Sequence, residues 1–375
     1  MESDALYRRL QQHLDRMPIG FPATESGVEL RILRQLFTPE EAEVALELSA
    51  APEPAATIHK RLKSRMTLPQ LTAMLEQMGR KGVLLRLPSA GGLLYSKLIF
   101  AVGIYERQLA RLTPEFQRDS RQYLEEEFAR AFHSKKTTQM RVVPVNKAIA
   151  VERNTATYDD IRAYVEASPG PFAAMPCICR RGKEILGEKC HQTSLRENCL
   201  TLGHAAKWMV DDGPAHFIAR EEMLALLDAA EEEGLVLQPE NTRNPLFVCC
   251  CCHCCCGVLA AAKKLPRPAE YFSSTLTAKI DAAACQSCGT CETRCQMDAI
   301  LTLADGTSAV DDSRCIGCAL CVSTCPSDAI RMEPKPSTRE IPANTRALYL
   351  KILQERYGPW GMAKLAARKM LGMKI

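Results

Sequence analysis

The chain carries two matching cysteine runs near its C-terminus, and their spacing restricts what this region can fold into. The first run is Cys285, Cys288, Cys291 and Cys295, and the second is Cys315, Cys318, Cys321 and Cys325. Both follow the pattern C-x2-C-x2-C-x3-C and continue into Asp-Ala-Ile, with every equivalent position offset by 30 residues. The region is therefore an internal duplication.

The spacing within each run suits an iron–sulfur cluster better than a zinc ion. Three cysteines at i, i+3 and i+6 on a tight loop can bind three irons of one cubane, and the fourth thiolate then reaches the other cluster. Zinc sites instead use two C-x2-C pairs that are well separated. We therefore assign one 4Fe–4S cluster to Cys285, Cys288, Cys291 and Cys325. A second is assigned to Cys315, Cys318, Cys321 and Cys295.

These residues resemble the motif of a bacterial two-cluster ferredoxin, over about residues 276–335. The resemblance implies a ferredoxin-type domain that transfers electrons. One position departs from the pattern. Gln296 follows the fourth cysteine of the first run, where the family usually has proline and where the second run has Pro326.

Eleven of the nineteen cysteines lie outside these runs, all in the middle of the chain. They are Cys177, Cys179, Cys190, Cys199, Cys249, Cys250, Cys251, Cys252, Cys254, Cys255 and Cys256. An extended backbone would direct Cys249 and Cys251 to one face and Cys250 and Cys252 to the other. We predict at least one further iron–sulfur cluster here. The first candidate ligands are Cys177, Cys179, Cys190 and Cys199, completed or replaced by members of the later run.

Other interpretations of the middle cysteines stay open. Several can pack as small apolar groups, because free cysteine is among the most buried residue types. A structural zinc site from Cys177, Cys179, Cys190 and Cys199 is an alternative, although C-x-C is tight for two ligands of one ion. His191 and His253 adjoin cysteines and are candidate ligands. Arg180 and Arg181 would favour thiolate and raise a reduction potential, unless they lie on a solvated turn.

The middle segment and the duplicated motif together resemble multi-domain 4Fe–4S proteins of anaerobic microbes. The residues that carry this resemblance are PCICR, Cys190, Cys199 and the run CCCCHCCC. Proteins of this kind often begin with a winged-helix-like region. The resemblance implies iron–sulfur redox work in an anaerobic setting.

The N-terminal region has the element order of a winged helix. Thr38-Pro39-Glu40-Glu41 combines a capping box with proline at the first helical position. A second helix is expected from about Ala56 to Leu62 and a third from about Thr67, followed by two strands around Ser89–Gly92. A charged helix over 113–135 is expected to pack on this region or on a second copy of the chain.

We predict an α+β chain in five segments. They are a winged-helix-like domain (1–110), a connecting helix (111–139), a cysteine-rich domain (140–270), a two-cluster ferredoxin domain (271–335) and a basic helical tail (336–375). In the third segment, one or two strands are expected over 141–151 and a helix that is capped near Thr157. A further helix is expected over 220–234, with strands on either side of residues 240–245. The tail is expected to cover the ferredoxin domain, to dock a partner or to touch a membrane surface weakly.

The predicted function is electron transfer with a redox partner protein, as a carrier or an oxidoreductase subunit. One alternative is an iron–sulfur transcription regulator, because Lys60, Arg61, Lys63 and Arg65 could contact phosphates; the third helix, with one basic outward residue, disfavours DNA binding. Another is a reductase subunit that acts at a middle-domain cluster. The sequence has no nucleotide-binding fingerprint. It also lacks a signal-peptide core and a stretch of about 18 apolar residues, so we expect a cytoplasmic protein.

Overall fold

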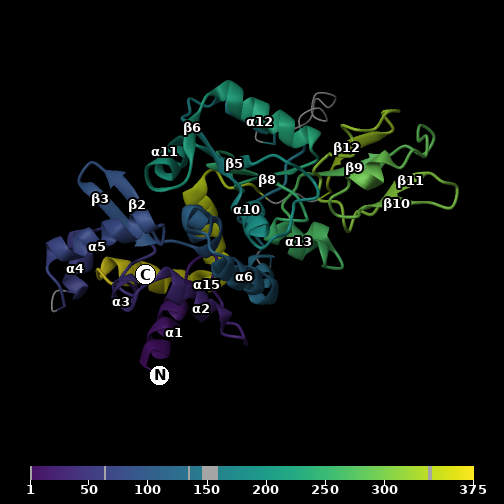
Figure 1. Cartoon of the computed structure of the whole chain (residues 1–375). Helices are drawn as coiled ribbons and strands as arrows, with labels where there is room; N and C mark the ends of the chain where they lie inside the picture. The colour runs from purple at the N-terminus through teal and green to yellow at the C-terminus, as the bar shows by residue number, and fades with distance from the viewer. Residues whose placement is uncertain (1, 63–64, 134–135, 146–158, 337–339) are drawn as a thin grey trace. The chain divides into compact units, whose positions relative to one another are not determined.

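The chain forms two compact units (Figure 1). The computed structural model describes residues 2–62, 65–133, 136–145, 159–336 and 340–375. The first unit comprises Met1–Phe132, Trp208–Pro214 and Tyr349–Ile375, and the second comprises His133–Lys207 and Ala215–Leu348. The division into five segments stays a prediction. No helix among the described residues is both long and apolar enough to cross a membrane.

The first unit begins with helices and a small antiparallel sheet of order β1-β3-β2. The elements are α1 (Glu2–Asp15), α2 (Val28–Leu36), α3 (Pro39–Ala45), β1 (Glu53–Pro54), α4 (Ala55–Leu62), α5 (Leu68–Lys81), β2 (Leu84–Ser89) and β3 (Gly92–Lys97). The capping box predicted at Thr38 is confirmed, and a second at Thr67 begins α5. The winged-helix assignment stays a prediction, and β1 is a strand that the sequence pattern did not indicate.

Further helical elements and an aromatic cluster complete this unit. The elements are η1 (Phe100–Ile104), η2 (Glu106–Arg111), α6 (Pro114–Tyr123), η3 (Leu124–Phe128), α7 (Ala129–His133) and α15 (Thr345–Met370), whose first residues belong to the second unit. Thr113 caps α6, where the charged helix was predicted to begin. Phe100 packs against Phe21, Tyr123 and Phe128 with ring centroids 5.3–5.8 Å apart. This cluster forms an apolar centre for the unit.

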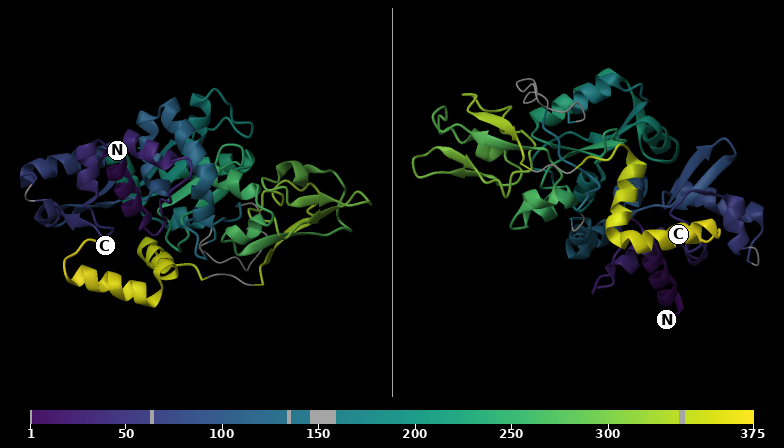
Figure 2. Two further views of the ribbon diagram at one scale, coloured as in Figure 1. Left: turned by 90° about the horizontal axis from the view of Figure 1, so that it is seen from below. Right: turned by 180° about the vertical axis from the view of Figure 1, so that it is seen from behind.

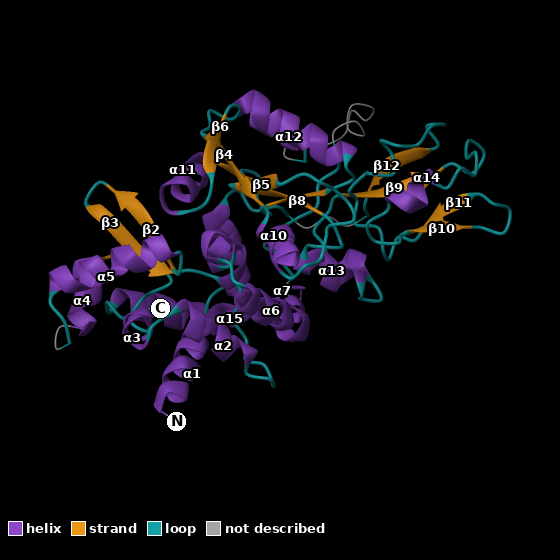
Figure 3. Ribbon diagram, in the orientation of Figure 1, coloured by secondary structure: helices purple, strands orange, loops and turns teal. Residues whose placement is uncertain are grey.

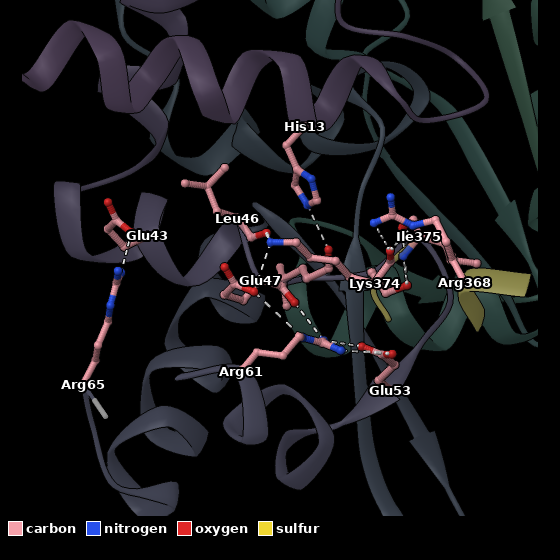
Figure 4. Close-up of polar contacts among 12 residues, drawn as sticks. His13, Glu43, Leu46, Glu47, Glu53, Arg61, Arg65, Arg368, Lys374 and Ile375 are labelled. Atoms are coloured by element: carbon pink, nitrogen blue, oxygen red, sulfur yellow. Dashed lines mark hydrogen bonds and ion pairs between the residues drawn. The ribbon is translucent and has the colours of Figure 1, made fainter. Parts of the chain in front are cut away.

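The end of the chain is bound to the N-terminal region of the same unit (Figures 2 and 4). Gly358 (φ 63°) and Pro359 break α15 into two parts. Beyond it, Lys374 Nζ donates to the Leu46 carbonyl at 2.6 Å, and the Ala50 N–H donates to the Ile375 carbonyl at 2.8 Å. The last residues of the predicted tail thus contact the N-terminal region of their own unit. Weak membrane contact through this tail stays a prediction.

A five-stranded antiparallel sheet is the centre of the cysteine-rich part of the second unit (Figure 3). Its strands are β4 (Phe172–Pro176), β5 (Glu197–Leu202), β6 (His216–Ile218), β7 (Val236–Pro239) and β8 (Phe247–Cys251), in the order β6-β4-β5-β8-β7. The strands predicted on either side of residues 240–245 are β7 and β8. Because β5 and β8 are neighbours, they bring Cys199 opposite Cys249.

Helices connect and follow the strands of this sheet. They are α9 (Ile161–Ala167), α10 (Ile178–Ile185), α11 (Gly203–Asp212), α12 (Arg220–Glu232), α13 (Gly257–Lys263) and the turn η4 (Pro268–Tyr271). The helix predicted over 220–234 is confirmed as α12. The cap predicted near Thr157 is wrong for α9, because Asp160 accepts the Ala163 N–H at 2.9 Å; Thr157 itself lies outside the described residues. The strand predicted after Arg141 falls partly on residues 146–158, which lie outside the described residues.

The duplication appears in the strands of the ferredoxin module, the name used here for residues 271–335. The elements are β9 (Leu276–Ile280), α14 (Thr290–Arg294), β10 (Ile300–Thr302), β11 (Ser308–Val310) and β12 (Ile330–Pro334). β9 pairs with β12 and β10 with β11, both antiparallel. The partners Ile300 and Val310 are equivalent to Ile330 and Ile280, so the two ladders are copies of each other. The fold class of the whole chain mixes helix and strand, as an α+β chain requires.

The duplication also appears in left-handed backbone conformations at equivalent positions. Ser287 (φ 54°) corresponds to Gly317 (φ 74°), Gly289 (φ 72°) to Ala319 (φ 62°), and Asp298 (φ 53°) to Asp328 (φ 51°). Non-glycine residues rarely adopt this conformation, so its recurrence shows that the cysteine loops need it. These turns curl each loop around its cysteines.

The loop at Gly317 leaves no room for a side chain. A Cβ there would lie 2.2 Å from the Leu276 carbonyl oxygen and 2.2 Å from Ser274 Oγ, whereas a Cβ at Gly289 would meet nothing within 4 Å. We therefore expect Gly317→Ala to lower the free energy of unfolding by about 3 kcal/mol or more, from overlap plus strain. Gly289→Ala should cost only about 1 kcal/mol, since Ala319 already occupies the equivalent position. Thermal unfolding followed by circular dichroism measures both, and equal losses would contradict this account.

Candidate metal centres

Two cavities in the ferredoxin module are lined by its eight cysteines. The first is lined by Cys285, Cys288, Cys291 and Cys325. The second is lined by Cys315, Cys318, Cys321 and Cys295. Each cavity gathers three cysteines of one repeat and the fourth cysteine of the other. This is the grouping that the spacing predicts.

The surroundings of the second cavity favour a bound metal. Its other lining residues are Ala278, Gln296, Met297, Ala299, Ile300, Ile316, Ala319 and Leu320, so the described residues that line it include no cation. Burial raises the pKa of the Cys318 thiol to about 12 and raises that of Cys321 well above its ordinary value. A thiolate here needs positive charge nearby, and the irons of a cluster would supply it. The donor set fits a cluster bound by four thiolates.

Polar groups of the backbone and of a side chain interact with one cysteine sulfur in each cavity. The Ala299 N–H lies 3.2 Å from Cys295 Sγ and donates to it. At the exposed Cys288, the hydroxyl and then the N–H of Thr290 lower the pKa of the thiol. Hydrogen bonds to ligand sulfurs are among the features by which a protein sets a cluster's potential.

The middle-domain cysteines separate into two groups of four and a remainder of three. The compact quartet consists of Cys190, Cys252, Cys254 and Cys255, whose sulfur atoms all lie within 4.8 Å of one another. Cys190 comes from the loop between α10 and β5, and the other three from the segment between β8 and α13. The sequence grouped Cys177, Cys179, Cys190 and Cys199 as first candidates, but the structure places these four in three different groups.

The second quartet consists of Cys177, Cys179, Cys251 and Cys256. Its thiols lie close enough to shift one another's pKa: Cys179 interacts with Cys177 and Cys256, and Cys256 interacts with Cys251. Cys177 immediately precedes α10 and Cys256 immediately precedes α13. The hydrogen bond from Cys179, followed by the charge of Arg180, lowers the pKa of Cys177 to about 7 against the effect of burial. The group therefore offers four convergent sulfur donors.

The remaining three cysteines lie on the sheet. Cys199 and Cys249 are cross-strand neighbours whose thiols interact. Cys249 also contacts Cys251, whereas Cys250 points into the apolar core, where burial raises its pKa to about 12. The alternation predicted for an extended run is thus confirmed over the length of β8. Cys250 therefore packs as a small apolar group, which was the alternative interpretation for several of the middle cysteines.

Two cations of α10 reach the compact quartet. Arg180 is only 2% exposed, and its Nη2 lies 3.6 Å from Cys252 Sγ while Nη1 donates to the Leu195 carbonyl at 3.0 Å. Lys183 Nζ donates to the Cys254 carbonyl at 3.0 Å. Arg181 instead pairs with Glu184 on the surface. Arg180 thus lies beside a cysteine sulfur, Arg181 lies on the surface of α10, and the sequence pattern missed Lys183.

Gln296 joins the cysteine-rich part to the ferredoxin module. Its Oε1 accepts the His253 backbone N–H at 3.0 Å and lies 2.7 Å from His253 Nδ1, and its Nε2 donates to the Gly234 carbonyl at 2.9 Å. His253 thus turns one ring nitrogen to Gln296 rather than to sulfur. The other candidate, His191, directs its backbone N–H to Cys254. Gln296, which stands where the ferredoxin pattern usually has proline, thus forms hydrogen bonds between the two parts.

Two arginines of the basic stretch before α5 pair with carboxylates of their own unit (Figure 4). Arg61 pairs with Glu53 at 2.5 Å, and Arg65 pairs with Glu43 at 2.6 Å. Lys63 lies outside the described residues. On α5, Arg80 pairs with Glu76 at 3.4 Å. A cation that is held by a carboxylate is less available to a phosphate.

Comparison with known proteins bears on the ferredoxin module alone. Residues 278–332 match the family described as a 4Fe-4S dicluster domain. No curated protein and no solved structure matches the chain. The matched residues span both cavities, from Ala278 on β9 to Met332 on β12, and so include all eight of their cysteines. The module is therefore similar to domains that carry iron–sulfur clusters.

Proposed function

We propose that this chain is an iron–sulfur electron-transfer protein with two 4Fe–4S clusters in its ferredoxin module. The observation that carries the proposal is the division of eight cysteines between two cavities, three from one repeat and one from the other in each. A 4Fe–4S cluster supplies reversible one-electron chemistry. The chain's own residues bind the irons, exclude water through the apolar walls, and direct N–H groups at the sulfurs.

The exposure of the two cavities differs, and this difference favours one order of electron flow. In the first cavity, Cys288 is exposed. In the second cavity no cysteine is exposed, and Cys315 and Cys321 are buried. A redox partner protein can therefore approach the first cavity at Cys288. The second cavity lies next to Gln296, which contacts the cysteine-rich part of the same unit. We place the first cluster toward the partner and the second toward the middle domain.

The second quartet is the proposed site of a further iron–sulfur cluster. Cys177, Cys179, Cys251 and Cys256 supply four sulfur donors from two segments, and Arg180 provides a positive charge beside Cys177. The chain Cys295–Gln296···His253–Cys252 leads from the second cavity to the cysteine run through a single hydrogen bond between residues. This connection gives electrons a short route into the middle domain.

The regulator and reductase alternatives are not adopted. The arginines that would meet DNA phosphates are paired with Glu53 and Glu43. A reductase needs a substrate site, and the cavities described here are lined by the module's cysteines and their apolar neighbours. Transfer of electrons between a partner and the middle domain accounts for the arrangement without either activity.

The fourth cysteine of each repeat is assigned to the cluster of the other repeat, and serine substitution can test this assignment. Serine offers an oxygen ligand in place of sulfur and so shifts the reduction potential of the cluster that it binds. Cys325→Ser should alter the same cluster as Cys288→Ser, although 37 residues separate them, and Cys295→Ser should alter the same cluster as Cys318→Ser. Anaerobic redox titration followed by electron paramagnetic resonance resolves the two clusters. If Cys325→Ser instead alters the same cluster as Cys318→Ser, each repeat binds its own cluster.

The Gln296 link can be tested against an exposed glutamine of the same module. Gln296 is 2% exposed, and Gln296→Ala would leave the buried Gly234 carbonyl and the His253 N–H without their partner. We expect the free energy of unfolding to fall by about 1–3 kcal/mol and electron equilibration with the middle domain to slow. Gln286→Ala should change stability by less than about 0.5 kcal/mol. Denaturant unfolding and photoreduction kinetics give the two readouts; identical behaviour of the two variants would argue against the link.

A further inference from the structure

The compact quartet is packed more tightly than the other cysteine groups of the chain. Cys190 Sγ lies 3.7 Å from Cys252 Sγ and 3.7 Å from Cys254 Sγ. Cys254 Sγ lies 3.5 Å from Cys252 Sγ and 3.7 Å from Cys255 Sγ. Within the described ranges, no other set of three or more cysteine, histidine or acidic residues has all its ligand atoms within 4.8 Å of one another. The cysteines of the ferredoxin module instead surround open cavities.

These distances match the edges of a tetrahedron around one ion. A zinc ion binds thiolate at about 2.3 Å, so the edges of an ideal ZnS₄ tetrahedron are about 3.8 Å long. In a cubane each thiolate binds a different iron, and the four sulfurs therefore lie farther apart on the outside of the cube. The compact quartet leaves room for one ion at its centre and not for a four-iron core.

The charges around the quartet suit a divalent ion. Four thiolates and one divalent cation leave a net charge of −2, and a buried charge needs compensation. Arg180, with Nη2 3.6 Å from Cys252 Sγ, and Lys183, bound to the Cys254 carbonyl, supply two positive charges. All four coordination positions are filled by protein sulfur, which is the arrangement of a structural zinc site rather than a catalytic one.

We propose that Cys190, Cys252, Cys254 and Cys255 bind a single structural Zn²⁺ ion, distinct from the clusters of the proposed function. The ion links a loop to a segment 62 or more residues later in the chain. That segment contains His253, which contacts Gln296, and it is flanked by Cys251 and Cys256 of the second quartet. The zinc ion thereby fixes the backbone that positions both the link to the ferredoxin module and the neighbouring ligands.

Metal analysis of the full chain tests this assignment. Protein purified without oxygen, from cells supplied with zinc and iron, should contain about one zinc per chain, with four sulfurs at about 2.3 Å by X-ray absorption at the zinc edge. Cys190→Ser and Cys255→Ser should each lower the zinc content at least tenfold while iron and acid-labile sulfide stay unchanged. Cys250→Ser, a buried cysteine of the same run outside both quartets, should lose neither metal.

The result separates this proposal from the proposed function. Cys177→Ser should lower iron and sulfide and leave zinc in place; if it leaves iron unchanged, the middle-domain cluster is wrong and the zinc assignment stands. The zinc assignment is overturned if Cys190→Ser and Cys255→Ser remove iron and sulfide, or if the intact protein holds iron in the compact quartet or no zinc. Should either serine variant fail to fold, the absorption spectrum of the intact protein decides the question alone.

Discussion

Buried cysteine sulfur is the constraint on which the second unit depends. All nineteen cysteines lie between Cys177 and Cys325, and a thiolate withdrawn from water needs positive charge beside it. Arg180 and Lys183 reach one group of them, and the described walls of the second module cavity contain no cation. Bound metal would supply further positive charge. The module's strands are only three to five residues long, so metal–thiolate bonds do much of what a larger apolar core does in other domains.

The duplication explains why the ferredoxin module was the most predictable part of the chain. A repeat offset of 30 residues sets the cysteine spacing, the paired ladders β9–β12 and β10–β11, and the left-handed residues at equivalent positions. The grouping of the cysteines was predicted because the spacing is a local property of each loop, whereas the ladders and the left-handed positions were not predicted. Helix starts at Thr38 and Thr113 were predictable for the same reason, because a cap is determined by neighbouring residues.

The grouping of the eleven middle cysteines was not predictable, because it depends on which strands pair. Cys190 joins Cys252 only after β5 and β8 have become neighbours and brought their loops together. The sequence showed four early cysteines near one another in the chain and grouped them, but α10 separates Cys177 and Cys179 from Cys190, and β5 carries Cys199 into the sheet. Likewise, the basic stretch before α5 suggested phosphate contacts, and the carboxylates that neutralise it come from distant positions such as Glu43.

The difference between Gln296 and Pro326 makes the surroundings of the two cavities unequal. Pro326 has no N–H and no side-chain polar group, and it lies at the edge of the first cavity near the exposed Cys288. Gln296, at the equivalent position, borders the second cavity, and its amide bonds to His253 and to Gly234 in the cysteine-rich part. A symmetric pair of repeats would bind two equivalent clusters. Because a buried amide stands at one position and proline at the other, Gln296 links the wall of the second cavity to the middle domain. The first cavity instead has the exposed ligand Cys288, which a partner protein can approach.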